Sequence, residues 1–186
     1  MKRMLTTVAI AVLLLAVLTS GSYAFFTVEN TARNAITSGN IEFEIHEVND
    51  KGEVFPLEGI NVLPGDKVSK IVSAQNTGKK DMFIRVKLIK SVKDSELPAE
   101  NQIIVDTDSE NWTYEDGYYY YNKAIAPGEE TTPLFKEVTI DGESVGNEYI
   151  GKSFLLEVKG DALQTKNIDA EALKSIGWST APLDEN

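Results

Sequence analysis

The only histidine of the chain, His46, has the widest choice of chemistry, because a neutral imidazole can bind a metal or accept a proton. It stands between Glu44 and Glu47, so a metal site built from one histidine and carboxylates is conceivable. Zinc sites that need cysteine or a second histidine are excluded by the composition. We therefore expect His46 to be an exposed residue among surface acids.

A second group of candidate ligands is the acidic run Asp106, Asp108 and Glu110, whose spacing matches the start of an EF-hand calcium loop. Such a loop needs glycine at its sixth position and glutamate at its twelfth, where this chain has Asn111 and Gly117. We expect solvated loop acids, and we predict no metal site and no cofactor.

The sequence also gives little support for nucleophilic catalysis. A hydrolase triad would have to recruit His46, and the sequence has no nucleophile elbow. We therefore predict no catalytic residue and no enzymatic activity. An isopeptide bond between a lysine and an asparagine beside an acid stays open, because both residue types are common and their spacing names no pair.

The aromatic run Tyr118–Tyr121 is a candidate surface for a sugar or a partner. Successive side chains of a strand point to opposite faces, so Tyr118 and Tyr120 share one face and Tyr119 and Tyr121 the other. Ordinary sheet packing, with one pair in the core and one at the surface, is the simpler expectation.

Composition and charge restrict the class of protein further. The chain has 186 residues, of which 42% are hydrophobic and 25% charged, which is typical of a folded domain. Its formal net charge is −11. Nucleic-acid binding depends largely on Lys and Arg contacts to phosphates, so we predict no nucleic-acid partner.

The first 24 residues have the pattern of a secretory signal peptide. Lys2 and Arg3 precede an apolar run over residues 4–18, which is shorter than the ~20 residues of a membrane span. Ser22 and Ala24 are small residues at the positions that favour cleavage between Ala24 and Phe25. We expect a secreted protein, because a retained membrane anchor would need a longer apolar run.

The rest of the chain alternates short β-rich runs with turn signals, which predicts an all-β, antiparallel jelly-roll sandwich over residues 39–186. A hairpin is expected from residues 68–75 and 80–91, and another around Asp116-Gly117. One short helix is expected near the C-terminus, from Asp169 to Gly177. The predicted strands lie at 41–46, 68–75, 80–91, 103–106, 112–121, 132–140 and 154–158.

The segment 25–38 carries apolar residues but has no sheet partner that the local sequence identifies. An extended peptide can satisfy its backbone by pairing with an open sheet edge, either in its own domain or in a neighbour. We expect it to be donated to a neighbouring subunit, and the alternatives are a frayed terminus or a strand kept within its own domain. The expected anchors are Phe25, Phe26, Val28, Ala32 and Ile36.

Several motifs in order resemble the TasA/camelysin family, in its BsaA-like branch that depends on a SipW-type signal peptidase. Gly21 to Thr27 (GSYAFFT) and Ala35 to Phe43 (AITSGNIEF) resemble the cleavage junction and the entry to the first strand. The LPGDKV motif from Leu63 and the QNTG motif from Gln75 resemble two further family motifs. The set is completed by the aromatic residues 112–121, the turn that begins at Ala126, Phe135, GNEY from Gly146, Gln164 and Trp178.

The resemblance implies a jelly-roll subunit of biofilm-matrix fibres, exported by a Gram-positive bacterium to its surface or matrix. Its implied partners are other copies of the chain, joined head to tail by N-terminal donor strands, and the SipW-type signal peptidase. Other matrix components stay open as partners. Two further functions remain as alternatives, a camelysin-type metalloprotease and a monomeric adhesion module that uses the tyrosines.

Overall fold

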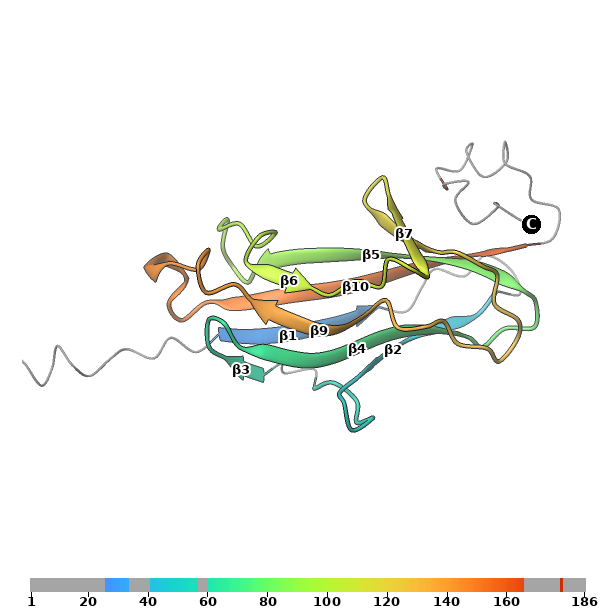
Figure 1. Ribbon diagram of the computed structural model, residues 1–186, viewed down its shortest axis with the longest axis horizontal. Coiled ribbons are helices and arrows are strands. Elements are labelled where there is room, and N and C mark those ends of the chain that lie inside the picture. Colours follow the sequence, from blue (N-terminus) through green and yellow to red (C-terminus); the bar gives the residue numbers. More distant parts are fainter. Residues whose placement is uncertain (1–25, 34–40, 57–59, 166–177, 179–186) are drawn as a thin grey trace, which may run out of the picture.

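The computed structural model describes residues 41–56, 60–165 and 178, together with the backbone of residues 26–33 (Figure 1). No helix in these ranges is long and apolar enough to cross a membrane. The predicted all-β class is confirmed. The elements are β1 (Phe26–Arg33), β2 (Phe43–Val48), β3 (Ile60–Val62), β4 (Lys67–Asn76), β5 (Met82–Val92), β6 (Ile103–Val105), β7 (Trp112–Glu115), β8 (Tyr118–Tyr121), β9 (Phe135–Ile140), the 3-10 helix η1 (Asn147–Tyr149) and β10 (Ser153–Gln164).

These strands form two sheets that face each other. The larger sheet has the order β3-β1-β10-β5-β8-β7, and the smaller one the order β2-β4-β9-β6. In Figure 1, β5 and β10 of the larger sheet lie above β4 and β2 of the smaller one. The pairs are antiparallel, except that β1 runs parallel to β10. The result is a β-sandwich, and its finer assignment as a jelly roll stays a prediction.

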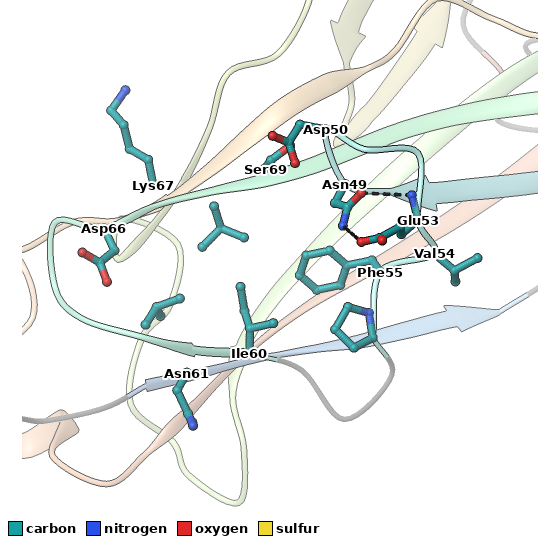
Figure 2. A pocket seen from close by; sticks show the side chains of 13 residues that line it. Asn49, Asp50, Glu53, Val54, Phe55, Ile60, Asn61, Asp66, Lys67 and Ser69 are labelled. Atoms are coloured by element: carbon teal, nitrogen blue, oxygen red, sulfur yellow. Dashed lines mark hydrogen bonds between the residues drawn. The ribbon is translucent and has the colours of Figure 1, made fainter.

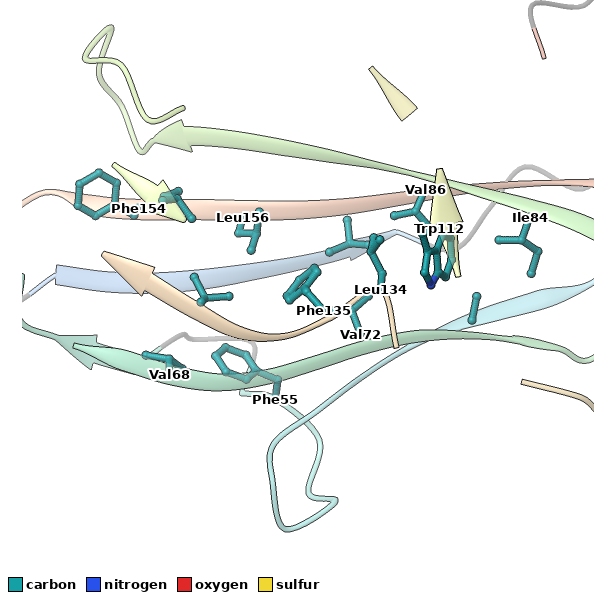
Figure 3. Packing of buried hydrophobic residues seen from close by; sticks show 14 of the residues in the cluster. Phe55, Val68, Val72, Ile84, Val86, Trp112, Leu134, Phe135, Phe154 and Leu156 are labelled. Atoms are coloured by element: carbon teal, nitrogen blue, oxygen red, sulfur yellow. The ribbon is translucent and has the colours of Figure 1, made fainter. Parts of the chain in front are cut away.

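The core lies between the two sheets and follows the alternation of each strand. In β10, Phe154, Leu156 and Val158 are completely buried, while the residues between them are only partly covered. Figure 3 shows Phe154 and Leu156 pointing toward the smaller sheet, where Val72 and Phe135 face them. Burial of each such side chain contributes roughly 1.5–3 kcal/mol, so this layer supplies most of the driving force for folding.

The hairpin expected from residues 68–75 and 80–91 is wrong, because β4 and β5 belong to different sheets. The short connection between them crosses the sandwich, and the buried Asn76 holds it in place. The Asn76 side-chain amide donates to the carbonyl oxygens of Lys80, at 2.8 Å, and Ile125, at 3.0 Å. Its Oδ1 accepts the N–H of Gly78 at 2.9 Å. These bonds replace the turn bonds that a hairpin would make.

The second expected hairpin is confirmed as β7–β8. Asp116 and Gly117 both have positive φ, 49° and 82°, as the tight turn between two paired strands requires. The predicted division of the tyrosines is confirmed, since Tyr119 and Tyr121 pack in the main core and Tyr118 and Tyr120 on the opposite face. The expectation that one pair lies at the surface is wrong, because Tyr120 is buried as well as Tyr121. Tyr121 packs with Trp112 in the main core, whereas Tyr120 lies against Trp178 on the outer face.

Two expectations fall on residues that the structure does not describe. The predicted C-terminal helix, Asp169–Gly177, lies outside the described residues, and so does the signal peptide with its Ala24–Phe25 junction. The predicted strand 132–140 is shorter in the structure, since β9 begins only at Phe135.

Candidate functional site

The strand β1 lies in the interior of the larger sheet, between β10 and β3. Its pairing with β10 runs in parallel from Thr27–Ser153 to Arg33–Lys159. Its pairing with β3 is short and antiparallel, from Phe26–Val62 to Val28–Ile60. We call the space that β1 fills between these two strands the β1 slot.

The expected donor-strand anchors map onto β1 only in part. Phe26, Val28 and Ala32 belong to its backbone, at the register positions of Val62, Phe154 and Val158. Phe25 and Ile36 lie outside the described residues. In the single chain, therefore, the N-terminal segment pairs within its own domain, and donation to a neighbour stays a prediction.

The strand β10 does not depend on β1 alone for its hydrogen bonds. On its other side β10 pairs with β5 along its full length, from Phe154–Val92 to Gln164–Met82. β3 is only three residues long, and among the described strands β1 is its one partner in the sheet. When β1 leaves, only the three-residue β3 loses its partner, whereas the pairing of β10 with β5 and of β5 with β8 stays intact.

A groove of about 630 Å³ opens beside β3, between the loop 49–56 and the start of β4. Figure 2 shows Phe55 at its centre and Asn49 bonded to Glu53 at its rim. The Asn49 Oδ1 also accepts the backbone N–H groups of Lys51 and Glu53, each at 2.9 Å. These hydrogen bonds of Asn49 stay within the loop 49–56. The polar groups at this rim therefore bind one another and do not point together at a ligand position.

His46 lies on β2 and is partly exposed, in contact with two carboxylates. Its Nδ1 is 3.0 Å from Glu130 Oε1, and its Nε2 is 3.9 Å from Glu44 Oε2. Ser73 Oγ donates a short hydrogen bond to the same Glu130 oxygen. In a serine hydrolase the histidine stands between serine and acid. Here the acid stands between them, so His46 is not placed to take a proton from Ser73.

The other sequence candidates are used to hold turns. Asp106 Oδ1 accepts the N–H groups of Lys136, at 3.0 Å, and Glu137, at 2.6 Å. Asp108 accepts the side-chain N–H of Asn111 at 2.8 Å, which with two backbone N–H bonds lowers the pKa of this carboxyl. Within the described residues no group of three or more acids and histidines is arranged to hold a metal ion.

The sequence analysis missed one pair of ionised side chains, Lys70 and Glu47, which face the core. The Lys70 side chain is 0% exposed and that of Glu47 4% exposed, and Lys70 Nζ lies 2.8 Å from Glu47 Oε2. We had placed Glu47 beside His46 at the surface, which is wrong. Strict alternation from Ile45 puts Glu47 on the inner face, and that signal was in the sequence.

The two best motifs of the resemblance are architectural. In LPGD, Asp66 Oδ2 accepts the N–H of Leu63 at 2.8 Å, and Gly65 has φ +88°. In QNTG, Asn76 ties the crossing between the sheets, as described above. Both motifs have a structural role, because each holds a connection between strands of the sandwich. Neither supplies a catalytic group.

The sequence profile of the camelysin metallo-endopeptidase family matches residues 1–102. No curated protein and no solved structure gives a significant match. The matched region is more than half of the chain and includes the β1 slot strands β1 and β3, the LPGD turn and the crossing at Asn76. The chain therefore belongs to the TasA/camelysin family.

Proposed function

We propose that this protein is a secreted structural subunit, which polymerises into extracellular biofilm-matrix fibres by donating residues 25–38 to the next copy. The proposal rests on the position of β1 within the larger sheet. It is an interior strand that comes first in the chain, and its neighbours β3 and β10 belong to the body of the domain. The β1 slot of one copy can accept the same segment of another copy, residue for residue.

Repetition of this exchange gives a chain of subunits. Each copy offers one segment and one slot, so the contact is heterologous and need not close. Backbone hydrogen bonds along Thr27–Arg33 provide direction and register, and the alternate side chains provide specificity. Electron microscopy of the purified mature protein tests the proposal, with filaments as the expected result and persistent monomers as the opposing one.

The family description favours one other function, a metallo-endopeptidase. The geometry around His46 speaks for the structural role, because Glu130 separates the histidine from Ser73 and the described residues hold no metal cluster. Purified protein is therefore expected to leave casein intact with zinc or calcium added, and His46→Ala is expected to change nothing. Cleavage that is lost in His46→Ala, or on chelation, would favour the protease instead.

Export through a SipW-type signal peptidase of a Gram-positive bacterium is part of the same proposal. The secreted protein should begin Phe25-Phe26-Thr27-Val28, because cleavage after Ala24 leaves the donated segment at the very N-terminus. N-terminal sequencing of the secreted material measures this directly. A start within β1 would remove part of the segment that the joint requires, and would contradict strand donation.

A further inference from the structure

The buried pair Lys70–Glu47 joins two neighbouring strands of the smaller sheet. Glu47 is on the edge strand β2 and Lys70 is on β4, which pair antiparallel with Glu47 opposite Val72. Lys70 is two residues from Val72 on the same face, so the two long side chains meet diagonally across the ladder. A register irregularity of β4 against β9 lies between Ser69 and Val72 and includes Lys70.

The surroundings of the pair are apolar. The Lys70 Nζ lies 4.7 Å from the centre of the Phe55 ring, and Val68 and Val72 flank it along the strand. Figure 3 shows Phe55, Val68 and Val72 at the layer between the sheets. Water therefore does not reach the amine or the carboxyl.

Among the described residues, the two groups have only each other. Lys70 Nζ lies 2.8 Å from Glu47 Oε2, and neither Nζ nor the two Glu47 oxygens has any other hydrogen-bond partner there. Replacing a buried ion pair by apolar residues is often neutral or stabilising, so such a pair is a poor device for stability alone. A close contact without saturated hydrogen bonds leaves both groups free to react with each other.

We propose that Lys70 and Glu47 condense to an intramolecular isopeptide bond that links β2 to β4. The Lys70 nitrogen attacks the Glu47 carboxyl carbon, a new C–N bond forms, and one C–O bond breaks. The leaving hydroxyl takes a proton from the amine and departs as water, so the reaction needs no oxidant, cofactor or activated substrate. The product is a neutral amide, which fits an apolar site better than two charges do.

The reacting amine must be unprotonated, and burial makes that form easier to reach than in water. Burial lowers the pKa of Lys70, and attraction to Glu47 only partly opposes this effect. No third carboxyl hydrogen-bonds to the pair among the residues described, so proton transfer must take place within the pair itself. We therefore expect the bond to form slowly after folding, over days rather than minutes.

The bond would serve a chain that has no cysteine and therefore no disulfide. It closes the loop from Glu47 to Lys70, which includes β3, one wall of the β1 slot. A covalent link of this kind stabilises the folded domain by restricting the unfolded chain, as a disulfide does.

Intact mass spectrometry of the mature protein tests the proposal without any variant. The expected mass is lower than the sequence mass by one water, and the modified fraction rises during incubation of the folded protein for several weeks. Proteolysis should yield one branched peptide that joins the segment around Glu47 to the segment around Lys70. A mass equal to the sequence mass at all times overturns the proposal.

Two variants fix the site of the bond. In Glu47→Gln the same attack expels ammonia, so the mass should fall by one ammonia instead of one water. In Lys70→Arg no loss should occur, and circular dichroism shows whether this variant is folded. The matched control is Lys67→Arg at the exposed Lys67–Glu137 pair, whose atoms are 2.6 Å apart. It should still lose water, and loss of water that persists in Lys70→Arg would place the bond elsewhere.

Discussion

A chain that starts at Gly39 is expected to form no fibres and to bind a synthetic peptide of residues 25–38. Its β1 slot is empty, so the backbone groups of β10 and β3 that faced β1 are unpaired and available to the peptide. It should stay folded, with a β-type circular dichroism spectrum, because β10 still pairs with β5. Electron microscopy measures the loss of fibres, and fluorescence anisotropy of a labelled peptide measures the binding.

A peptide of the same composition in scrambled order is the control, and it should not bind. A full-length Phe26→Asp variant should behave like the truncation, because it puts a carboxylate at the register position opposite the buried Val62. Normal filaments from the truncated chain would show that the fibre contact lies on another surface. Failure to bind the peptide in a folded truncated chain would show that the slot does not accept a strand from outside.

The second large effect is expected from Gly160→Val in β10. Valine favours strands and glycine weakens them, so strand propensity alone predicts stabilisation. The structure predicts the opposite, since a Cβ at Gly160 would lie 2.7 Å from the Phe43 ring and 3.0 Å from Ile45 Cδ1 across the sandwich. Overpacking of this kind costs about 1–3 kcal/mol of the free energy of unfolding, measured by urea denaturation.

Gly142→Ala is the matched control for this substitution. Its Cβ would meet the nearest atoms, in Gly65 and Pro64, at 3.5 Å, which is ordinary van der Waals contact. Its free energy of unfolding should change by less than about 0.5 kcal/mol, as is usual away from a packing constraint. Equal stability of Gly160→Val and the wild type would mean that Phe43 moves aside freely, and that the two sheets are not tightly packed there.

The alternation of side chains was enough to predict most of the sandwich from the sequence. The strands near Phe43, Val86 and Leu156 were recognised, because one face of each is buried and the period of two is clear. The Asp116-Gly117 turn was equally clear, because the tight turn between β7 and β8 needs positive φ at both positions.

The predictions that were wrong depended on contacts between residues that lie far apart in the sequence. A short connection between two strands predicts a hairpin, and only the buried side chain of Asn76, bonded to Ile125 in a distant loop, makes it a crossing between sheets. Tyr120 is covered by Trp178, which lies far along the chain and had no detectable relation to β8. Glu47 was expected at the surface beside His46, although alternation from Ile45 places it on the inner face, where it is buried with Lys70.

Under the proposed strand donation, the parallel pairing of β1 with its own β10 would also set how fast assembly can begin. A strand tethered beside its slot competes with incoming strands at an effective concentration on the order of millimolar. At low subunit concentration an incoming strand would lose this competition to the tethered strand. A subunit would then stay monomeric until its own strand is released. Growth should then show a lag that added fibre fragments shorten. Once a joint has formed, dilution should dissolve it only slowly.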